Sequence, residues 1–198
     1  MLTDERRVIT LYHTGYEELT RPDISRGRKN ADFGQGFYLT GDLQFAKRWA
    51  RERKDRDTVI NTYELDLGGL SVHRFERDGD WFGYIYSNRA GFEDALKGAD
   101  VITGPIANDT IYDTFGIITS GFIKKDDALK LLLNGPEYTQ TVIKTEKALS
   151  CLKWISSRKL DKEEIRNLRG TVKAEEEQFQ RQVTETLLKI TGEDPEDL

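Results

Sequence analysis

GRKNADFGQGFYLT (residues 27–40) is the stretch of this chain that decides the fold, and it reads as a glycine-rich loop leading into a strand. Gly34 and Gly36 lack a Cβ, so they accept backbone angles and close approaches that other residues resist. Residues 37–40 are rich in aromatic side chains, which is typical of a short strand. In a dinucleotide-binding βαβ unit the glycines follow the first strand, whereas here they precede it, so the sequence disfavours that fold.

Hydrophobic periodicity predicts further strands and helices along the chain, which together indicate an α+β fold. Strands are predicted at 7–12, 57–66, 99–103 and 138–145. Helices are predicted after Asp42 and at 92–97, 127–133 and 146–155, while 81–89 fits a helix or a strand. A long charged amphipathic helix, broken or bent near Gly170, is predicted at 161–191.

Two of the predicted strands carry polar side chains at defined positions. His13 directly follows strand 7–12, so it is expected at a strand end. Strand 138–145 alternates strictly, which places Gln140 on the same face as Val142.

Length and composition limit the classes of protein that fit. The 198 residues suit one domain with an appendage. The net charge of −5 argues against tight nonspecific binding to nucleic acid or an anionic membrane, without excluding a local basic patch. The chain shows no signal-peptide core and no apolar run of membrane-spanning length, so a cytoplasmic location is expected. Cys151 is the single cysteine and is interpreted as a small buried core residue in a reducing compartment.

Several common catalytic chemistries do not fit the residues present. His13 and His73 are the only histidines, so a site of several His and Cys metal ligands is excluded. A metal site built from carboxylates stays open, but nothing in the sequence demands one and no metal is expected. The chain has neither the GxSxG elbow of serine hydrolases nor a Walker-type phosphate loop. His73 lies in a charged segment and is interpreted as a surface residue. Asn88 and Arg89 are interpreted as solvent-facing residues at a helix end, with contact to a ligand as the alternative.

Three short motifs, in order, resemble those of the ADP-ribosyltransferase superfamily, in its His-Tyr-Glu branch. They are Tyr12-His13-Thr14-Gly15, then Gly36-Phe37-Tyr38-Leu39-Thr40, then Gln140-Thr141-Val142-Ile143-Lys144-Thr145. The resemblance covers roughly residues 8–155 and is closest to a little-characterised bacterial family that shares GR…DFGxGFYLT and a GPIAxD loop. It implies an ADP-ribosyltransferase-like split β-sandwich with flanking helices at 5–155 and a helical extension at 159–198.

The resemblance also implies a role for each matching residue, with NAD+ as co-substrate held between two sheets. His13 is expected to bond the adenosine-side ribose, and Thr14 and Gly15 to hold the nicotinamide amide. Tyr38, behind Gly36, is expected to stack on the nicotinamide ring. Arg28 is the candidate for the pyrophosphate, because its planar guanidinium suits paired oxygens.

Gln140 departs from the superfamily pattern, which has a glutamate at this position. An amide accepts a hydrogen bond from a ribose hydroxyl but supplies neither full negative charge nor a general base. Asp109 in the loop after Pro105 and Asp32 in the opening stretch are the candidates for the carboxylate.

Transfer of ADP-ribose from NAD+ to a macromolecular acceptor, protein or nucleic acid, is therefore the leading expectation, as in a bacterial toxin, effector or defence component. One alternative is a catalytically weak module that binds NAD+ or ADP-ribose, which Gln140 favours. Another is an interaction protein that contacts a partner, such as a neutralising protein, through the helix at 159–198.

Overall fold

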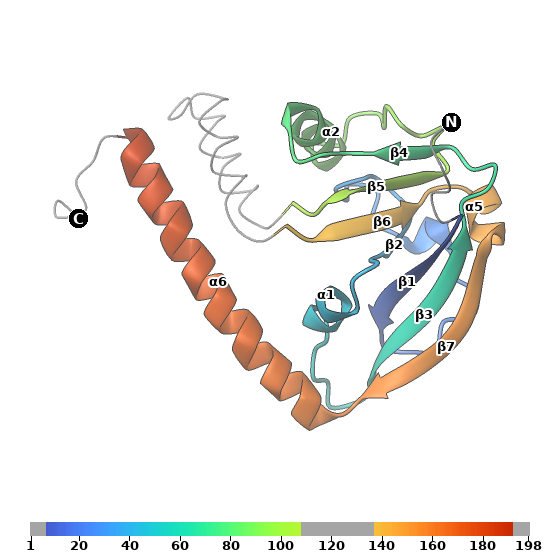
Figure 1. Cartoon of the computed structure of the whole chain (residues 1–198), viewed down its shortest axis with the longest axis horizontal. Helices are drawn as coiled ribbons and strands as arrows, with labels where there is room; N and C mark the ends of the chain where they lie inside the picture. The colour runs from blue at the N-terminus through green and yellow to red at the C-terminus, as the bar shows by residue number, and fades with distance from the viewer. Residues whose placement is uncertain (1–6, 108–136, 192–198) are drawn as a thin grey trace.

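The computed structural model describes residues 7–107 and 137–191 and shows an α+β arrangement with two sheets (Figure 1). One sheet has the order β1-β3-β7, formed by Val8–Gly15, Thr58–Asp66 and Leu152–Leu160. The other has the order β2-β6-β5-β4, formed by Phe37–Leu39, Thr139–Ile143, Val101–Pro105 and Val72–Arg74. The helical elements are η1 (Ile24–Arg26), α1 (Leu43–Arg48), α2 (Gly79–Arg89), α5 (Glu146–Ser150) and α6 (Lys162–Thr191).

Neighbouring strands are antiparallel in both sheets, except that β4 and β5 run parallel. The sheets meet where the backbones of Tyr12 and Thr40 exchange hydrogen bonds of 2.8 and 3.0 Å. The glycine-rich loop therefore delivers β2 to the junction between the two sheets.

Two apolar clusters lie on opposite faces of the four-stranded sheet. Phe37, Tyr63 and Ile143 belong to the cluster shared with the three-stranded sheet. Val142 belongs to the cluster under α2, which covers the other face (Figure 1). Because Val142 and Ile143 are consecutive, the predicted alternation of this strand is confirmed.

Helix α1 begins as predicted, because Asp42 accepts hydrogen bonds from the backbone N–H groups of Gln44 and Phe45. Only Asp161 separates the end of β7 from the start of α6. Ile165, in the first turns of α6, is 2% exposed and packs with Ile60 and Leu160. Figure 1 shows α6 running past α1 from the end of β7.

Several predicted elements are wrong. No helix forms at 92–97, where the chain makes turns, and β4 at Val72–Arg74 was not predicted. The helix predicted at 146–155 ends at Ser150, because the next residues pair with β3 as the strand β7, which passes through the expected junction between 155 and 159. His13 lies within β1 rather than at its end, and α6 continues through Gly170.

Residues 81–89, for which the sequence fitted a helix or a strand, belong to the helix α2. The helix predicted at 127–133 lies outside the described residues. Within 7–107 and 137–191, no helix combines the length and the apolar character needed to cross a membrane.

Candidate functional site

A cavity of about 510 Å³ lies at the end of the four-stranded sheet where β5 ends and β6 begins. Sites for small molecules and cofactors usually have volumes of roughly 300–1,000 Å³. The loop at 28–32, β2, α1, the end of α2 and α6 all contribute to the wall. The described residues that line it are Arg28, Ala31, Asp32, Tyr38, Phe45, Arg48, Trp49, Arg51, Arg89, Ile106, Ala107, Tyr138, Gln140, Val172 and Glu176.

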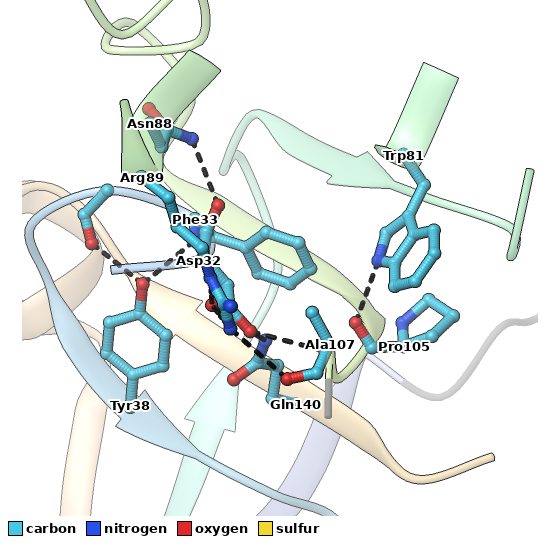
Figure 2. A network of polar contacts seen from close by, with 10 residues as sticks. Asp32, Phe33, Tyr38, Trp81, Asn88, Arg89, Pro105, Ala107 and Gln140 are labelled. Atoms are coloured by element: carbon cyan, nitrogen blue, oxygen red, sulfur yellow. Dashed lines mark hydrogen bonds and ion pairs between the residues drawn. The ribbon is translucent and has the colours of Figure 1, made fainter. Parts of the chain in front are cut away.

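Asp32 is the centre of a polar network in the cavity wall (Figure 2). Arg89 donates to Asp32 Oδ1 through Nε at 2.7 Å, and its Nη2 lies 2.6 Å from the same oxygen. Asp32 Oδ2 accepts from the backbone N–H of Ala107 at 3.2 Å and from Gln140 Nε2 at 3.3 Å. The Arg89 and Asp32 side chains are only 11% and 16% exposed, so water screens their attraction little. The positive charge of Arg89 therefore largely compensates the negative charge of Asp32.

This network fixes the orientation of Gln140. Its Nε2 donates to Asp32, so its Oε1 is turned away from Asp32 (Figure 2). An amide oxygen accepts hydrogen bonds only, and the residue as a whole is 4% exposed. Gln140 therefore contributes a fixed, uncharged acceptor to the cavity wall.

Tyr38 lines the same cavity from β2, the strand next to β6. It pairs with Val142, and Gln140 lies two residues further along β6, so Tyr38 and Gln140 share one face of the sheet. The Tyr38 hydroxyl donates to the Gly34 carbonyl at 2.7 Å and accepts from the Phe33 N–H at 2.9 Å. Burial raises the pKa of this hydroxyl above its ordinary value, so it stays protonated at neutral pH.

His13, Thr14, Gly15 and Gly36 are not among the described residues that line the cavity. Burial lowers the pKa of His13, and the neutral imidazole donates from Nδ1 to the Tyr38 carbonyl oxygen at 2.9 Å. The Thr14 hydroxyl donates to the Ala46 carbonyl in α1 at 2.6 Å. These two side chains tie β1 to β2 and to α1, and their predicted contacts with a ligand stay predictions.

Gly36 is required where β2 approaches β6. A Cβ at this position would lie 2.6 Å from both the Ile143 carbonyl oxygen and Val142 Cγ1, which is closer than real Cβ contacts. The glycine preceding the predicted strand thus permits the pairing that brings Tyr38 next to β6.

Arginine side chains dominate the charge of the cavity lining, with Asp32 and Glu176 as the described carboxylates. Arg89 is compensated by Asp32, and Arg48 forms an ion pair with Glu175 of α6. The Arg28 side chain makes no hydrogen bond or ion pair with any other residue of 7–107 and 137–191. Arg28 is therefore available to an anionic ligand.

An aromatic wall closes the α1 side of the cavity. The rings of Phe45 and Tyr138 are stacked with centroids 4.4 Å apart, and Trp49 meets Phe45 edge-on at 5.1 Å. The Arg48 guanidinium lies 4.9 Å from the centroid of Tyr138. Flat π surfaces beside cations suit a planar ring of a ligand.

The structure brings Arg28, Asp32, Tyr38 and Gln140 into one cavity, while Asp109 lies outside the described residues. The interpretation of Asn88 and Arg89 as solvent-facing residues is wrong. The last turn of α2 packs against the loop at 28–33, so Asn88 is 3% exposed and donates to the Asp32 carbonyl oxygen at 3.1 Å.

Two further interpretations are only partly right. His73 is half-buried in β4 and meets Phe75 edge-on at 4.4 Å between centroids. Cys151 is also half-buried, at the edge of the cluster between the sheets.

Sequence reasoning did not single out the residues that α1 and α6 contribute to the cavity, such as Arg48, Trp49, Val172 and Glu176. A helix was predicted after Asp42, but the sequence did not indicate which of its residues would line a cavity. The position of α6 beside the cavity depends on its packing against α1. No local sequence pattern predicts that contact.

A comparison of the sequence with protein families finds a match over residues 9–154, to a family described as "Protein of unknown function (DUF3990)". The chain belongs to this DUF3990 family. The matched segment runs from β1 through α5 to the first three residues of β7, and it includes Asp32, Tyr38 and Gln140. Neither the curated proteins nor the solved structures contain a match to the chain. The α6 wall of the cavity lies beyond the segment that defines the family.

In the described part of the chain, no group of three or more His, Cys, Asp or Glu side chains is placed to hold a metal ion.

Proposed function

We propose that this DUF3990 protein binds NAD+ in the cavity and transfers ADP-ribose to a macromolecular acceptor, as the resemblance to ADP-ribosyltransferases implies. In this reaction the bond between the ribose C1′ and the nicotinamide nitrogen breaks, and nicotinamide leaves as a neutral base with the bonding electrons. An acceptor nitrogen or oxygen bonds to C1′ and releases its proton to water. The observation that carries the proposal is the placement of Tyr38 and Gln140 on one face of adjacent strands, inside one cavity.

The cavity fits such a ligand in size and in charge. Its volume of about 510 Å³ is in the range of cofactor sites. Arg28 supplies a guanidinium with no competing acid among the described residues, and diphosphates favour such planar donors. The fixed ring of Tyr38 offers a flat apolar surface for the nicotinamide.

Cleavage of a bond between a sugar and a nitrogen base passes through a cation-like state at the ribose. Gln140 Oε1 is held as an acceptor and supplies a partial negative charge for this state. The Asp32 carboxylate stands behind it as the full negative charge, at 3.3 Å from Gln140 Nε2, but Arg89 offsets much of its field. The described residues thus stabilise the developing cation only weakly.

That weakness favours a second candidate function, an NAD+ or ADP-ribose binding module with little turnover. The specific observation is that neither candidate group in the described cavity lining supplies an uncompensated negative charge, because Gln140 is neutral and Asp32 is paired with Arg89. Asp109, the other candidate carboxylate, lies outside the described residues.

Calorimetric titration of NAD+ combined with a nicotinamide-release assay tests both functions. The wild-type chain is expected to bind NAD+ saturably, and Tyr38→Ala to weaken binding about tenfold by removing the flat surface. Tyr38→Phe keeps the ring and is expected to retain most of the affinity. Tyr86→Ala removes a half-buried tyrosine outside the described cavity lining and serves as the matched control.

Binding with nicotinamide release supports the transferase, and binding without release supports the module. The absence of NAD+ binding to folded wild-type protein, or equal losses in Tyr38→Ala and Tyr86→Ala, overturns both.

A further inference from the structure

A basic segment begins in the last turn of α1 and stands out in an acidic chain. Residues 47–56, KRWARERKDR, contain six Lys or Arg and two Asp or Glu, so their net charge is 6 − 2 = +4, against −5 for the whole chain. Overall charge therefore hides a strongly positive segment.

This segment, which we name the basic strip (residues 47–56), leads from the cavity to the surface. Arg48, Trp49 and Arg51 line the cavity. Residues 51–57 are all exposed, and they connect α1 to β3. A ligand bound along the strip would therefore end in the cavity.

Part of the positive charge on the strip is not compensated by the protein. Lys47, Arg48 and Arg56 pair with Glu164, Glu175 and Asp55, respectively. Arg53 and Lys54 form no ion pair with any residue of the described ranges.

Arg51 lines the cavity close to charged groups of both signs. Its Nη1 donates to the Arg48 and Ala50 carbonyl oxygens at 2.8 and 2.9 Å. Burial and the nearby charge of Arg169 lower its pKa, while Glu176 and Tyr16 act in the opposite direction. The guanidinium remains charged at neutral pH.

Tyr16 adds an aromatic surface to the strip. The Arg53 and Arg56 guanidinium carbons lie 5.7 and 5.6 Å from its ring centroid, and Arg53 Nε donates to its hydroxyl at 3.3 Å. The tyrosine is 37% exposed although its ring is large and apolar. Cations interleaved with an exposed aromatic ring match the pattern that binds single-stranded nucleic acids, where the backbone meets the cations and bases stack on the rings.

We propose that the basic strip and Tyr16 bind a single strand of nucleic acid and guide it into the cavity as the acceptor of ADP-ribose. The acceptor role rests on the proposed function, whereas binding of the strand does not. A nucleophilic nitrogen or oxygen of the strand replaces nicotinamide at the ribose C1′ and loses its proton to water. Single-stranded nucleic acid fits better than an acidic peptide, because Tyr16 and Trp49 offer stacking surfaces that carboxylates do not use. It fits better than a duplex, whose bases are already paired and stacked.

The test is fluorescence anisotropy of a fluorescein-labelled oligothymidylate and an oligouridylate, without NAD+, at several salt concentrations. The wild-type chain is expected to bind both, with an affinity that falls as salt rises. Arg53→Ala/Lys54→Ala removes two phosphate contacts, so the slope of log K against log salt should become shallower by about 1.4 and the affinity at low salt should fall about tenfold.

The matched control is Lys97→Ala/Lys153→Ala, which changes the net charge equally at two exposed positions outside the strip. Its affinity should stay within about twofold of wild type if the strip is the site. Tyr16→Ala should weaken binding about tenfold and Tyr16→Phe should preserve it, because stacking requires the ring and not the hydroxyl.

Three results would overturn the proposal: no salt-sensitive binding by folded wild-type protein, equal losses in the two double variants, or displacement of the oligonucleotide by polyglutamate at equal concentration of charge. NAD+ titration of Arg53→Ala/Lys54→Ala separates the two proposals. Retained NAD+ affinity with lost strand binding in this variant supports both proposals. Strand binding by wild-type protein that does not bind NAD+ supports the basic strip as a binding site and overturns the proposed transfer reaction.

Discussion

Asp32, which is partly buried, and Asp100, which is buried, lie at opposite ends of the four-stranded sheet, and each is paired with a cation, yet their surroundings differ. Asp100 precedes β5 and accepts from the Ser71 N–H at 2.8 Å, the Thr145 hydroxyl at 2.7 Å and Lys147 Nζ at 2.8 Å. Asp32 has a short contact only with Arg89, and its bonds to Ala107 and Gln140 are 3.2 and 3.3 Å long. Asp32 lines the cavity, whereas Asp100 is not among its described lining residues.

Asp100 is a carboxylate that stabilises the fold, whereas Asp32 is a carboxylate that shapes the cavity wall. Asp100 joins the turn before β4, the start of β5 and the start of α5, so its short bonds fasten three segments of the chain. Asp32 uses longer bonds to orient an amide that faces a cavity. Charge and burial alone do not distinguish the two, but bond length and the neighbouring space do.

The largest expected effect is the loss of unfolding free energy when Asp100 is replaced. Asp100→Ala leaves the Ser71 N–H and the Thr145 hydroxyl without their acceptor, and should lower the free energy of unfolding by about 3 kcal/mol. Urea denaturation measures the loss, and calorimetric titration of the folded variant should give an unchanged NAD+ affinity. A change in NAD+ affinity comparable to that of Tyr38→Ala would contradict the separation of the two ends.

A smaller effect is expected at the Asp32 end. Gln140→Glu places a second carboxylate beside Asp32 in a largely buried site, which should lower the free energy of unfolding by about 2 kcal/mol. The double variant Asp32→Asn/Gln140→Glu exchanges the two groups and should recover most of the loss, because the amide then donates to the carboxylate. Denaturation of the single and double variants in parallel checks this, and additive losses would contradict the coupling.

The smallest effect concerns acid stability. Hydrogen bonds from Lys147, the Ser71 N–H and Thr145 lower the pKa of Asp100 to about 2. A carboxylate with a depressed folded-state pKa stabilises the fold above its unfolded pKa, and this contribution is lost as pH falls from about 4 to about 2. Asp100→Asn should therefore show a shallower decline of unfolding free energy in this window than wild type. Parallel curves between pH 4 and pH 2 would argue against the assignment.

Local patterns in the sequence were sufficient to predict much of the framework. The alternation of strand 138–145 and the cap at Asp42 each depend on near neighbours, and each is confirmed. By contrast, Ala148, Leu149 and Leu152 recur at helical spacing, yet Leu152 begins β7, because pairing with β3 outweighs local preference. The α+β class was therefore predictable, while the extent of the three-stranded sheet was not.

The candidate site was predicted in part for the same reason. Tyr38, Asp32, Arg28 and Gln140 were chosen from motifs, and the structure places them in one cavity. Arg89 was misjudged because its partner Asp32 lies 57 residues away in the chain, a contact with no local signature. Residues of α1 and α6 were missed because they reach the cavity only through tertiary packing.

The cavity also has an order of assembly during protein synthesis. Arg28, Tyr38 and Gln140 are translated before α6, which adds Val172 and Glu176 to the wall. On the ribosome, the nascent chain therefore acquires both sheets before it acquires the helix that borders the cavity. Ligand binding that needs this wall begins only after α6 has emerged and packed against α1.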